Sequence, residues 1–78
     1  MATTKTPALS TLVKQVARST YSQDWRVSRR GDTLTVTSRV GTPYAYTSEH
    51  PVSDYDNTPA DAERLADTHA ARRSLYDN

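Results

Sequence analysis

The sequence of 78 residues predicts one small α+β domain of order α-β-β-β-α, with two helices on one face of a three-stranded antiparallel sheet. Three observations predict this fold. Apolar residues near the N-terminus recur at helical spacing, alternating patterns flank a Gly-Asp turn, and a second threonine-proline pair opens another helix. We place the domain over residues 7–76, between a flexible N-terminus at 1–6 and a tail at 77–78.

The first helix is expected over about residues 7–19. Thr6 caps its first turn, and Pro7 suits the first helical position because its missing N–H is not needed there. The following apolar residues stand at the spacing i, i+3, i+4, i+7: Leu9, Leu12, Val13 and Val16. This stripe is typical of an amphipathic helix that packs on a core.

Two strands are expected on either side of Gly31-Asp32, a suitable two-residue hairpin loop. This loop length sets Val27 opposite Val36 on the same face of the sheet. The other face should be polar and basic. It would present Arg26, Ser28, Thr33, Thr35, Thr37 and Arg39, with Arg29 and Arg30 at the hairpin tip.

A short third strand is expected at residues 44–47. A three-residue loop before it would place Tyr44 and Tyr46 on the core face, whereas a two-residue loop would place them on the opposite face. Residues 48–57 contain many turn formers and are expected to be an irregular connector, in which His50 is an exposed loop residue.

The second helix is expected over about residues 59–74. Thr58, followed by proline, repeats the helix opening, and Asp61 stands at the third helical position as in a shortened capping box. The residues on one face are Ala62, Leu65, Ala66 and His69. On this face, we expect His69 to be a partly buried helix residue whose ring nitrogens are satisfied by hydrogen bonds.

The formal net charge of +1 conceals a segregation of charge along the chain. Residues 1–40 carry seven Lys or Arg and two acids, a balance of +5. Residues 41–78 carry three Arg and seven acids, a balance of −4. The two halves of the chain therefore favour opposite partners.

The composition excludes several classes of protein. The chain has no cysteine, which excludes a disulfide framework and a cysteine-ligated zinc site. No apolar run approaches the ~20 residues that a membrane-spanning helix needs. The polar N-terminus lacks the pattern of a secretory signal, so we expect a cytoplasmic protein.

No motif indicates catalysis. The two glycines cannot form a phosphate-binding loop, and no serine stands in a nucleophile elbow. The side chains of Glu49, His50, Asp54 and Asp56 match no spacing of metal ligands. We therefore expect a protein that is not an enzyme and that holds neither metal nor cofactor.

Acids concentrate between residues 49 and 67, where six of them accompany a single base, Arg64. Tyr55 lies between two of these acids, and tyrosine is favoured at the energetic centre of interfaces. The contacts predicted for a basic partner are Glu49, Asp54, Tyr55, Asp56, Asp61, Glu63 and Asp67. The alternative is that the acids keep a small protein soluble and cap its helix.

In its small size, its lack of cysteine and its acids from Glu49 to Asp67, the chain resembles phage-encoded anti-CRISPR proteins and other anti-defence inhibitors. This resemblance implies a non-enzymatic inhibitor of a basic, nucleic-acid-binding protein or ribonucleoprotein complex, such as a CRISPR effector. Carboxylates on such an inhibitor would occupy sites made for phosphates and so block nucleic-acid binding. We expect no membrane partner, and a monomer or weak homodimer.

The alternative function is a nucleic-acid-binding module, whose contacts would be Arg26, Arg29, Arg30 and Arg39. The order α-β-β-β-α also resembles the double-stranded RNA-binding domain. That family grips phosphates with lysines at the start of its second helix, whereas residues 58–63 of this chain are acidic. A third class is an assembly protein that dimerises through the uncovered edge of the third strand.

Overall fold

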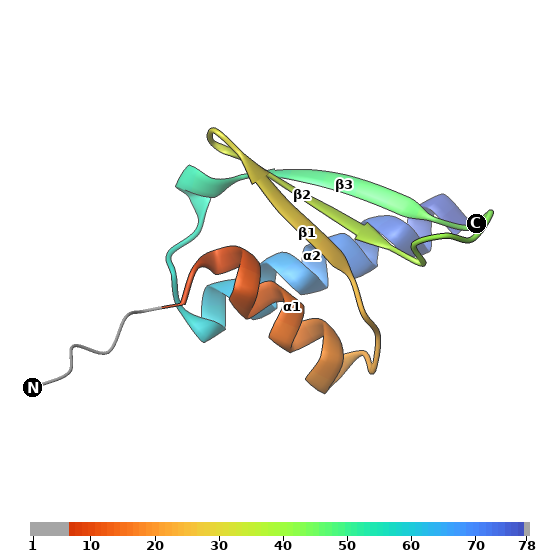
Figure 1. Cartoon of the computed structure of the whole chain (residues 1–78), viewed down its shortest axis with the longest axis horizontal. Coiled ribbons are helices and arrows are strands. Elements are labelled where there is room, and N and C mark those ends of the chain that lie inside the picture. The colour runs from red at the N-terminus through yellow and green to blue at the C-terminus, as the bar shows by residue number, and fades with distance from the viewer. Residues whose placement is uncertain (1–6, 78) are drawn as a thin grey trace, which may run out of the picture.

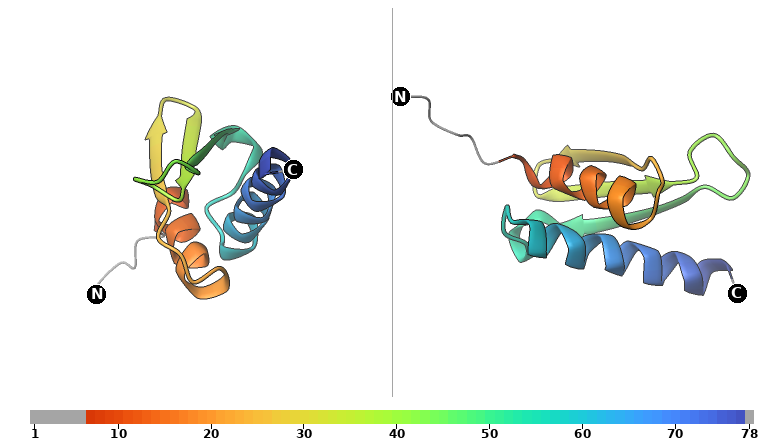
Figure 2. Two further views of the ribbon diagram at one scale, coloured as in Figure 1. Left: turned by 90° about the vertical axis from the view of Figure 1, so that its right-hand side faces the viewer. Right: turned by 90° about the horizontal axis from the view of Figure 1, so that it is seen from below.

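The computed structural model describes residues 7–77 and has the α+β fold that the sequence predicts. The strands form one antiparallel sheet of order β1-β2-β3, and both helices cover the same face of it (Figures 1 and 2). The elements are α1 (Leu9–Thr20), β1 (Arg26–Arg30), β2 (Thr33–Ser38), β3 (Tyr46–Pro51), the 3-10 helix η1 (Val52–Asp54) and α2 (Pro59–Asp77). The N-terminal segment 1–6, expected to be flexible, lies outside the described residues, as does residue 78.

Helix α1 begins later than predicted. Ala8 has an extended backbone (φ −62°, ψ 151°) and provides no side-chain cap, while the expected cap Thr6 lies outside the described residues. The predicted apolar stripe is confirmed, since its first three residues are buried and Val16 packs half-buried against the core. Helix α1 therefore uses the face that the sequence indicated.

The β1–β2 hairpin has the predicted register, with Val27 opposite Val36 across a turn at Gly31-Asp32. Gly31 has a φ of +59°, which glycine adopts without the steric cost of a Cβ. Val27 and Val36 are both buried beneath the sheet. The hairpin therefore fixes which face of the sheet meets the helices.

The third strand differs from the prediction in position and length. It spans Tyr46–Pro51 rather than residues 44–47, so the first four residues of the expected irregular connector are strand. His50, expected to be exposed, is 1% exposed on the core face of this strand. The sequence conceals β3 because its core-facing positions carry polar Ser48 and His50, and because Pro51 is tolerated at the end of an edge strand.

Neither expected placement of the two loop tyrosines holds, because the loop between β2 and β3 occupies residues 39–45. Tyr44 lies in this loop and is 69% exposed. Tyr46 lies opposite Ser38 in the sheet register and is half-buried. Its ring centroid is 5.4 Å from that of His69, so Tyr46 alone packs toward the core.

Helix α2 confirms the predicted buried face and runs to Asp77 rather than to residue 74. The hydroxyl of Thr58 accepts a hydrogen bond from the Asp61 N–H at 3.2 Å, as an N-cap does. Asp77, assigned to the tail from the sequence, belongs to the helix, and Arg39 binds its carboxylate at 3.0 and 2.7 Å. This ion pair holds the last helical turn against the β2–β3 loop.

A chain of hydrogen bonds crosses the core from β2 through α2 to β3. Ser38 Oγ lies 3.0 Å from His69 Nε2, and Ser48 Oγ lies 2.6 Å from His69 Nδ1 and 2.7 Å from His50 Nε2. All four side chains are buried. The expected satisfaction of both His69 nitrogens by hydrogen bonds is thus confirmed.

The Nδ1 atom of His50 has no hydrogen-bond partner within residues 7–77. This observation decides which atom donates and which accepts in each of these hydrogen bonds. A buried acceptor without a partner is tolerated better than a buried N–H without one. We therefore assign the hydrogen of each imidazole to Nε2. His50 then donates to Ser48, Ser48 donates to His69, and His69 donates to Ser38.

Burial lowers the pKa of both histidines to about 4. The nearby guanidinium group of Arg72 adds to the lowering of the pKa of His50, and that of Arg73 to the lowering of the pKa of His69. Both rings are therefore neutral at physiological pH, as the hydrogen-bond chain requires.

We expect the free energy of unfolding to fall as the solution is acidified below pH 6.5. In the unfolded chain the histidines bind protons at their ordinary pKa, so the stability present above pH 6.5 is lost as the pH falls toward 4. Urea denaturation should show a loss of about 2–4 kcal/mol between pH 7.5 and pH 5, where most carboxylates stay ionised. A stability that is constant over this range would contradict the account.

The variant Ser48→Ala should lower the free energy of unfolding by about 2–4 kcal/mol, because it leaves an unpaired polar atom on each of two buried imidazoles. The matched control is Thr47→Ala, which removes a hydroxyl from the neighbouring, exposed position of β3. Its loss should not exceed about 1 kcal/mol. If urea denaturation shows the same loss of unfolding free energy for both variants, the buried hydrogen bonds of Ser48 contribute no more than an exposed hydroxyl does.

Candidate functional site

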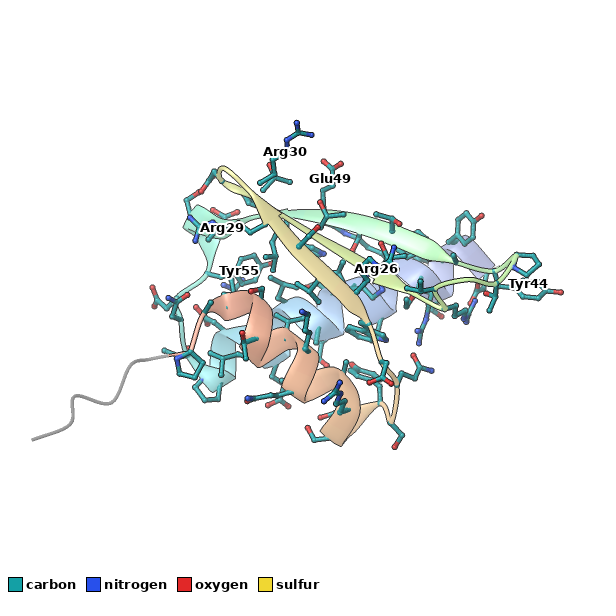
Figure 3. All side chains as sticks on the ribbon, viewed as in Figure 1. Arg26, Arg29, Arg30, Tyr44, Glu49 and Tyr55 are labelled. Carbon is teal, nitrogen blue, oxygen red and sulfur yellow. The ribbon has the colours of Figure 1, made fainter. Side chains whose placement is uncertain are left out.

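The structure separates Glu49 from the other acids of the predicted interface. Glu49 lies in β3 opposite Thr35, which in turn lies opposite Ser28. These side chains stand on the sheet face that no helix covers, and Figure 3 shows Glu49 projecting from that face. The remaining acids of the set follow β3 or lie on α2, which packs on the other face.

Tyr55 packs inward where the chain leaves η1. Its ring is half-buried against the core, with its centroid 6.3 Å from that of His50. The Arg64 guanidinium carbon lies 4.2 Å from the ring centroid, and Arg64 also donates to the Asp54 carbonyl oxygen at 2.6 Å. Tyr55, predicted from the sequence as a partner contact, therefore anchors this segment to the core with half of its ring buried.

Asp61 ties the same segment to the first turn of α2. Its Oδ2 atom accepts a hydrogen bond from the Asp56 N–H at 2.6 Å, and its Oδ1 atom lies 3.6 Å from Arg64 Nε. The flanking residues Asp54 and Asp56 are exposed, and their carboxylates make no ion pair within residues 7–77. We call Asp54, Tyr55, Asp56 and Asp61 the acidic turn.

The two remaining acids lie farther along α2. Asp67 accepts a hydrogen bond from the Tyr21 hydroxyl at 2.5 Å, which links α2 to the end of α1. Burial raises the pKa of Tyr21 to about 12, and the hydrogen bond to Asp67 adds to the shift. Glu63 is exposed one turn before Asp67 on the same side of the helix, so these two acids share one side of α2.

The four arginines of the alternative site do not share a surface. Arg26 and Arg30 stand on the uncovered sheet face, in register with Thr37 and Thr33. Arg29 occupies the opposite face at the hairpin tip, where its Nε donates to the Gly31 carbonyl oxygen at 2.9 Å. Arg39, predicted on the polar sheet face, follows β2 with a φ of +56° and binds Asp77 instead.

The charge segregation along the sequence is not a separation in space. The backbone N–H of Val52 donates to the Asp32 carbonyl oxygen at 2.7 Å, and Ser53 donates twice to the Asp32 carboxylate at 3.1 and 3.0 Å. These bonds hold the start of the acidic segment against the hairpin tip that carries Arg29 and Arg30 (Figure 3). The acidic turn therefore has a basic neighbour.

Exposed apolar residues in two segments were missed from the sequence. The exposed large apolar side chains within residues 7–77 are Val40, Tyr44, Leu75 and Tyr76. They come from the β2–β3 loop and the last turn of α2, which lie at the end of the molecule opposite the hairpin tip (Figure 1). No periodic pattern connects two such distant segments.

Within residues 7–77, no group of three or more His, Asp or Glu side chains is placed to hold a metal ion. Among the described helices, none is both long and apolar enough to cross a membrane. In comparisons with protein-family models, curated proteins and solved structures, the chain matches none.

We expect Asp61→Ala to loosen the acidic turn, because it removes the acceptor of the Asp56 N–H. Amide hydrogen exchange at Asp56 should become faster, and the free energy of unfolding should fall by about 1–2 kcal/mol. Asp61→Asn keeps an oxygen that accepts this bond and should restore most of the protection. The control Glu63→Ala should leave exchange at Asp56 unchanged; faster exchange in both alanine variants would contradict the assigned role of Asp61.

Proposed function

We propose that this chain is a small, non-enzymatic inhibitor that binds a basic, nucleic-acid-binding protein or complex and blocks its binding of nucleic acid. A CRISPR effector, the target of the phage proteins that the chain resembles, is the kind of partner we propose, and such a target implies a cytoplasmic location. The observation that carries the proposal is the acidic turn, whose Asp54 and Asp56 carboxylates are exposed and have no ion-pair partner within residues 7–77.

The acidic turn presents its two free carboxylates in a fixed arrangement. Tyr55 has an extended backbone (φ −131°, ψ 141°), and its ring is held between the core and Arg64. The residues on either side of it are then about 6–7 Å apart along the chain. Because the segment is already ordered by Arg64 and Asp61, little conformational entropy is lost when a partner binds.

The chemistry of the acidic turn suits a groove that binds phosphates. Lysine and arginine side chains that contact a nucleic-acid backbone also bind carboxylates through charge-assisted hydrogen bonds. Glu63 and Asp67 add negative charge on α2, which favours a basic partner during its approach. Glu49 is left out of the proposed contacts because it stands on the other face of the sheet.

The uncovered sheet face supports the alternative nucleic-acid-binding function less well. It retains only Arg26 and Arg30 of the four predicted arginines, and Glu49 stands on the same face. A carboxylate on that face repels phosphates and offsets part of the attraction of the two guanidinium groups. We therefore treat direct binding of nucleic acid as an outcome of the test.

The test measures competition with a purified CRISPR effector complex from the host of origin and its fluorescently labelled target duplex. Wild-type chain should lower the fluorescence anisotropy of the duplex by displacing it from the complex. Asp54→Lys and Asp56→Lys should each weaken this inhibition at least about tenfold, because the reversed charge repels a basic groove. The matched control Glu49→Lys changes the net charge equally on the other sheet face and should inhibit like the wild type.

Two outcomes would overturn the proposal. One is an inhibition that Asp54→Lys and Asp56→Lys leave intact, or no inhibition by the wild type. The other is a gel shift of duplex DNA or RNA by the chain alone, with a steep salt dependence and loss in Arg26→Ala/Arg30→Ala, which would establish a nucleic-acid-binding module.

A further inference from the structure

We infer that an extended, acidic segment of a second partner protein adds to the sheet as a fourth strand beside β1. Three of the five residues of β1 are exposed arginines, Arg26, Arg29 and Arg30, and none of them makes an ion pair within residues 7–77. A strand that joins the edge of a sheet is held by main-chain hydrogen bonds and selected by its side chains. This inference does not rest on the proposed function, because the acidic turn takes a basic partner.

Alternate residues of β1 direct their backbone groups outward. The Val52 N–H donates to the Asp32 carbonyl oxygen at 2.7 Å, so Asp32 and every second residue after it in β2 bond toward β3. The residues between them bond to β1, which leaves the N–H and C=O groups of Val27 and Arg29 directed away from the sheet. Within the described residues, no backbone hydrogen bond outside the strand pairs uses these groups.

The two edges of the sheet differ. On β3, the carbonyl oxygen of Glu49 already accepts a hydrogen bond from Arg72 Nη1 at 3.2 Å, and Pro51 has no N–H to offer. On the other side, β1 is the outermost strand, and α1 lies beneath the sheet rather than beside this edge (Figures 1 and 2). An added strand therefore finds its free backbone groups at β1, and not at the third strand as considered from the sequence.

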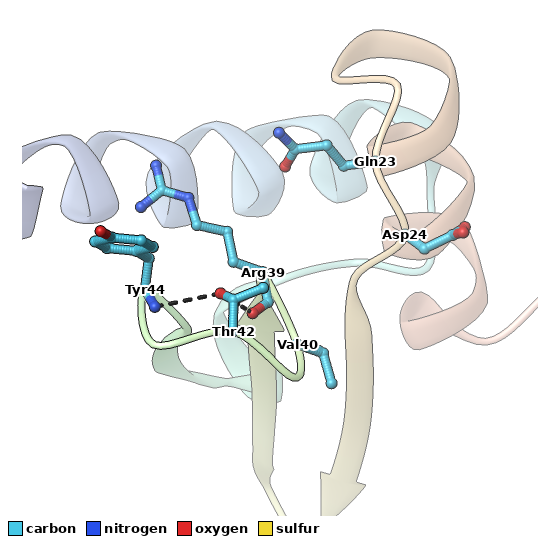
Figure 4. Close-up of a pocket in the computed structure, with 6 residues that line it drawn as sticks. All are labelled: Gln23, Asp24, Arg39, Val40, Thr42 and Tyr44. Carbon is cyan, nitrogen blue, oxygen red and sulfur yellow. Dashed lines mark hydrogen bonds between the residues drawn. The ribbon is translucent and has the colours of Figure 1, made fainter.

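The segment that leads into β1 is held by side-chain contacts. The Oε1 atom of Gln23 accepts hydrogen bonds from Trp25 Nε1 at 2.9 Å and from Arg73 Nη1 at 3.0 Å. Asp24 pairs with Arg18 at 2.8 Å. Figure 4 shows Gln23 and Asp24 on this segment, directly before the strand. Because β1 is ordered in advance, little conformational entropy is lost when a partner strand binds.

The placement of the arginines favours an acidic strand over a nucleic acid. Arg26 and Arg30 stand on the uncovered face of the sheet, whereas Arg29 stands on the opposite face. Successive side chains of an added strand also alternate between the two faces, so acids along it reach all three guanidinium groups. A phosphate backbone that lies across the uncovered face would leave Arg29 without a contact.

The same charges disfavour a second copy of this chain. Antiparallel pairing of two β1 strands along their whole length would set Arg26 of each copy opposite Arg30 of the other. Like charges directly opposite each other are destabilising. Charges on an edge strand thus keep copies of the chain apart and select a strand of opposite charge.

The test uses a fluorescein-labelled peptide, Ser-Glu-Glu-Thr-Val-Glu-Ser, whose three acids stand opposite the three arginines in antiparallel pairing. Its fluorescence anisotropy should rise as the full chain is added up to about 1 mM, a range that covers weak binding. A matched peptide with proline in place of valine has the same charge but lacks the N–H that bonds to the Val27 carbonyl oxygen. It should bind at least about tenfold more weakly.

Arg26→Glu/Arg30→Glu should weaken binding of the first peptide at least about tenfold, and Arg29→Glu at least about threefold. Each variant exchanges attractions between the strands for repulsions. Lys14→Glu makes the same change of charge as Arg29→Glu at an exposed position of α1, and it should bind like the wild type. Saturating peptide should also slow amide hydrogen exchange at Val27 and Arg29 of the wild type at least about tenfold, as measured by NMR.

The inference is overturned if the wild type leaves the anisotropy of the peptide unchanged up to about 1 mM. It is also overturned if the proline peptide binds equally well, or if exchange at Val27 and Arg29 is not slowed, as expected for an ionic contact alone. These outcomes leave the proposed function standing, because they do not involve the acidic turn. Displacement of the peptide by duplex DNA that binds Arg29→Glu as tightly as the wild type would assign the arginines to phosphates and overturn the inference too.

Discussion

The hydrogen-bond chain Ser38–His69–Ser48–His50 is the constraint on which the rest of the structure depends. It joins β2, β3 and α2 in the middle of the core, where a sheet and helix of this size would otherwise meet through a few leucine and valine side chains. Each hydroxyl and imidazole has a partner only if β3 pairs in this register and α2 runs in this direction. These hydrogen bonds therefore specify one packing of β2, β3 and α2, whereas apolar contacts alone would tolerate several.

The candidate site depends on this constraint. His50 is buried at the end of the strand pairing, where Pro51 lies opposite Thr33 beside the hairpin tip, and Asp32 receives the first residues of η1. Tyr55 then packs beside His50, so the two aspartates around it face solvent. The position of the acidic turn thus follows from a pair of buried histidines, and the ordering of its backbone follows from Arg64 and Asp61.

The sequence was sufficient to predict the features that depend on residues close together along the chain. Gly31-Asp32 and the alternating valines predicted the hairpin register, and Thr58 with the spacing of Leu65 and Ala66 predicted the start and buried face of α2. It was insufficient to place residues whose position depends on a contact with a residue distant along the chain. His50 was expected in an exposed loop, but it is buried and bonds to Ser48, which in turn bonds to His69 on another element. In the same way, Arg39 leaves the sheet face for Asp77, which fastens the β2–β3 loop to the last turn of α2. Glu49 stands on the uncovered face of the sheet, apart from the acids that follow it.

We propose that the partner binds at the acidic turn, on a scaffold whose strand register is held by the buried hydrogen bonds of Ser38, His69, Ser48 and His50. Hydrogen–deuterium exchange of the full chain, free and bound to the purified effector complex, tests this placement most directly. The account predicts that binding slows amide exchange at residues 54–63 and leaves exchange in β1 and β2 unchanged. Slower exchange confined to the sheet around Arg26 and Arg30, with residues 54–63 unaffected, would contradict it.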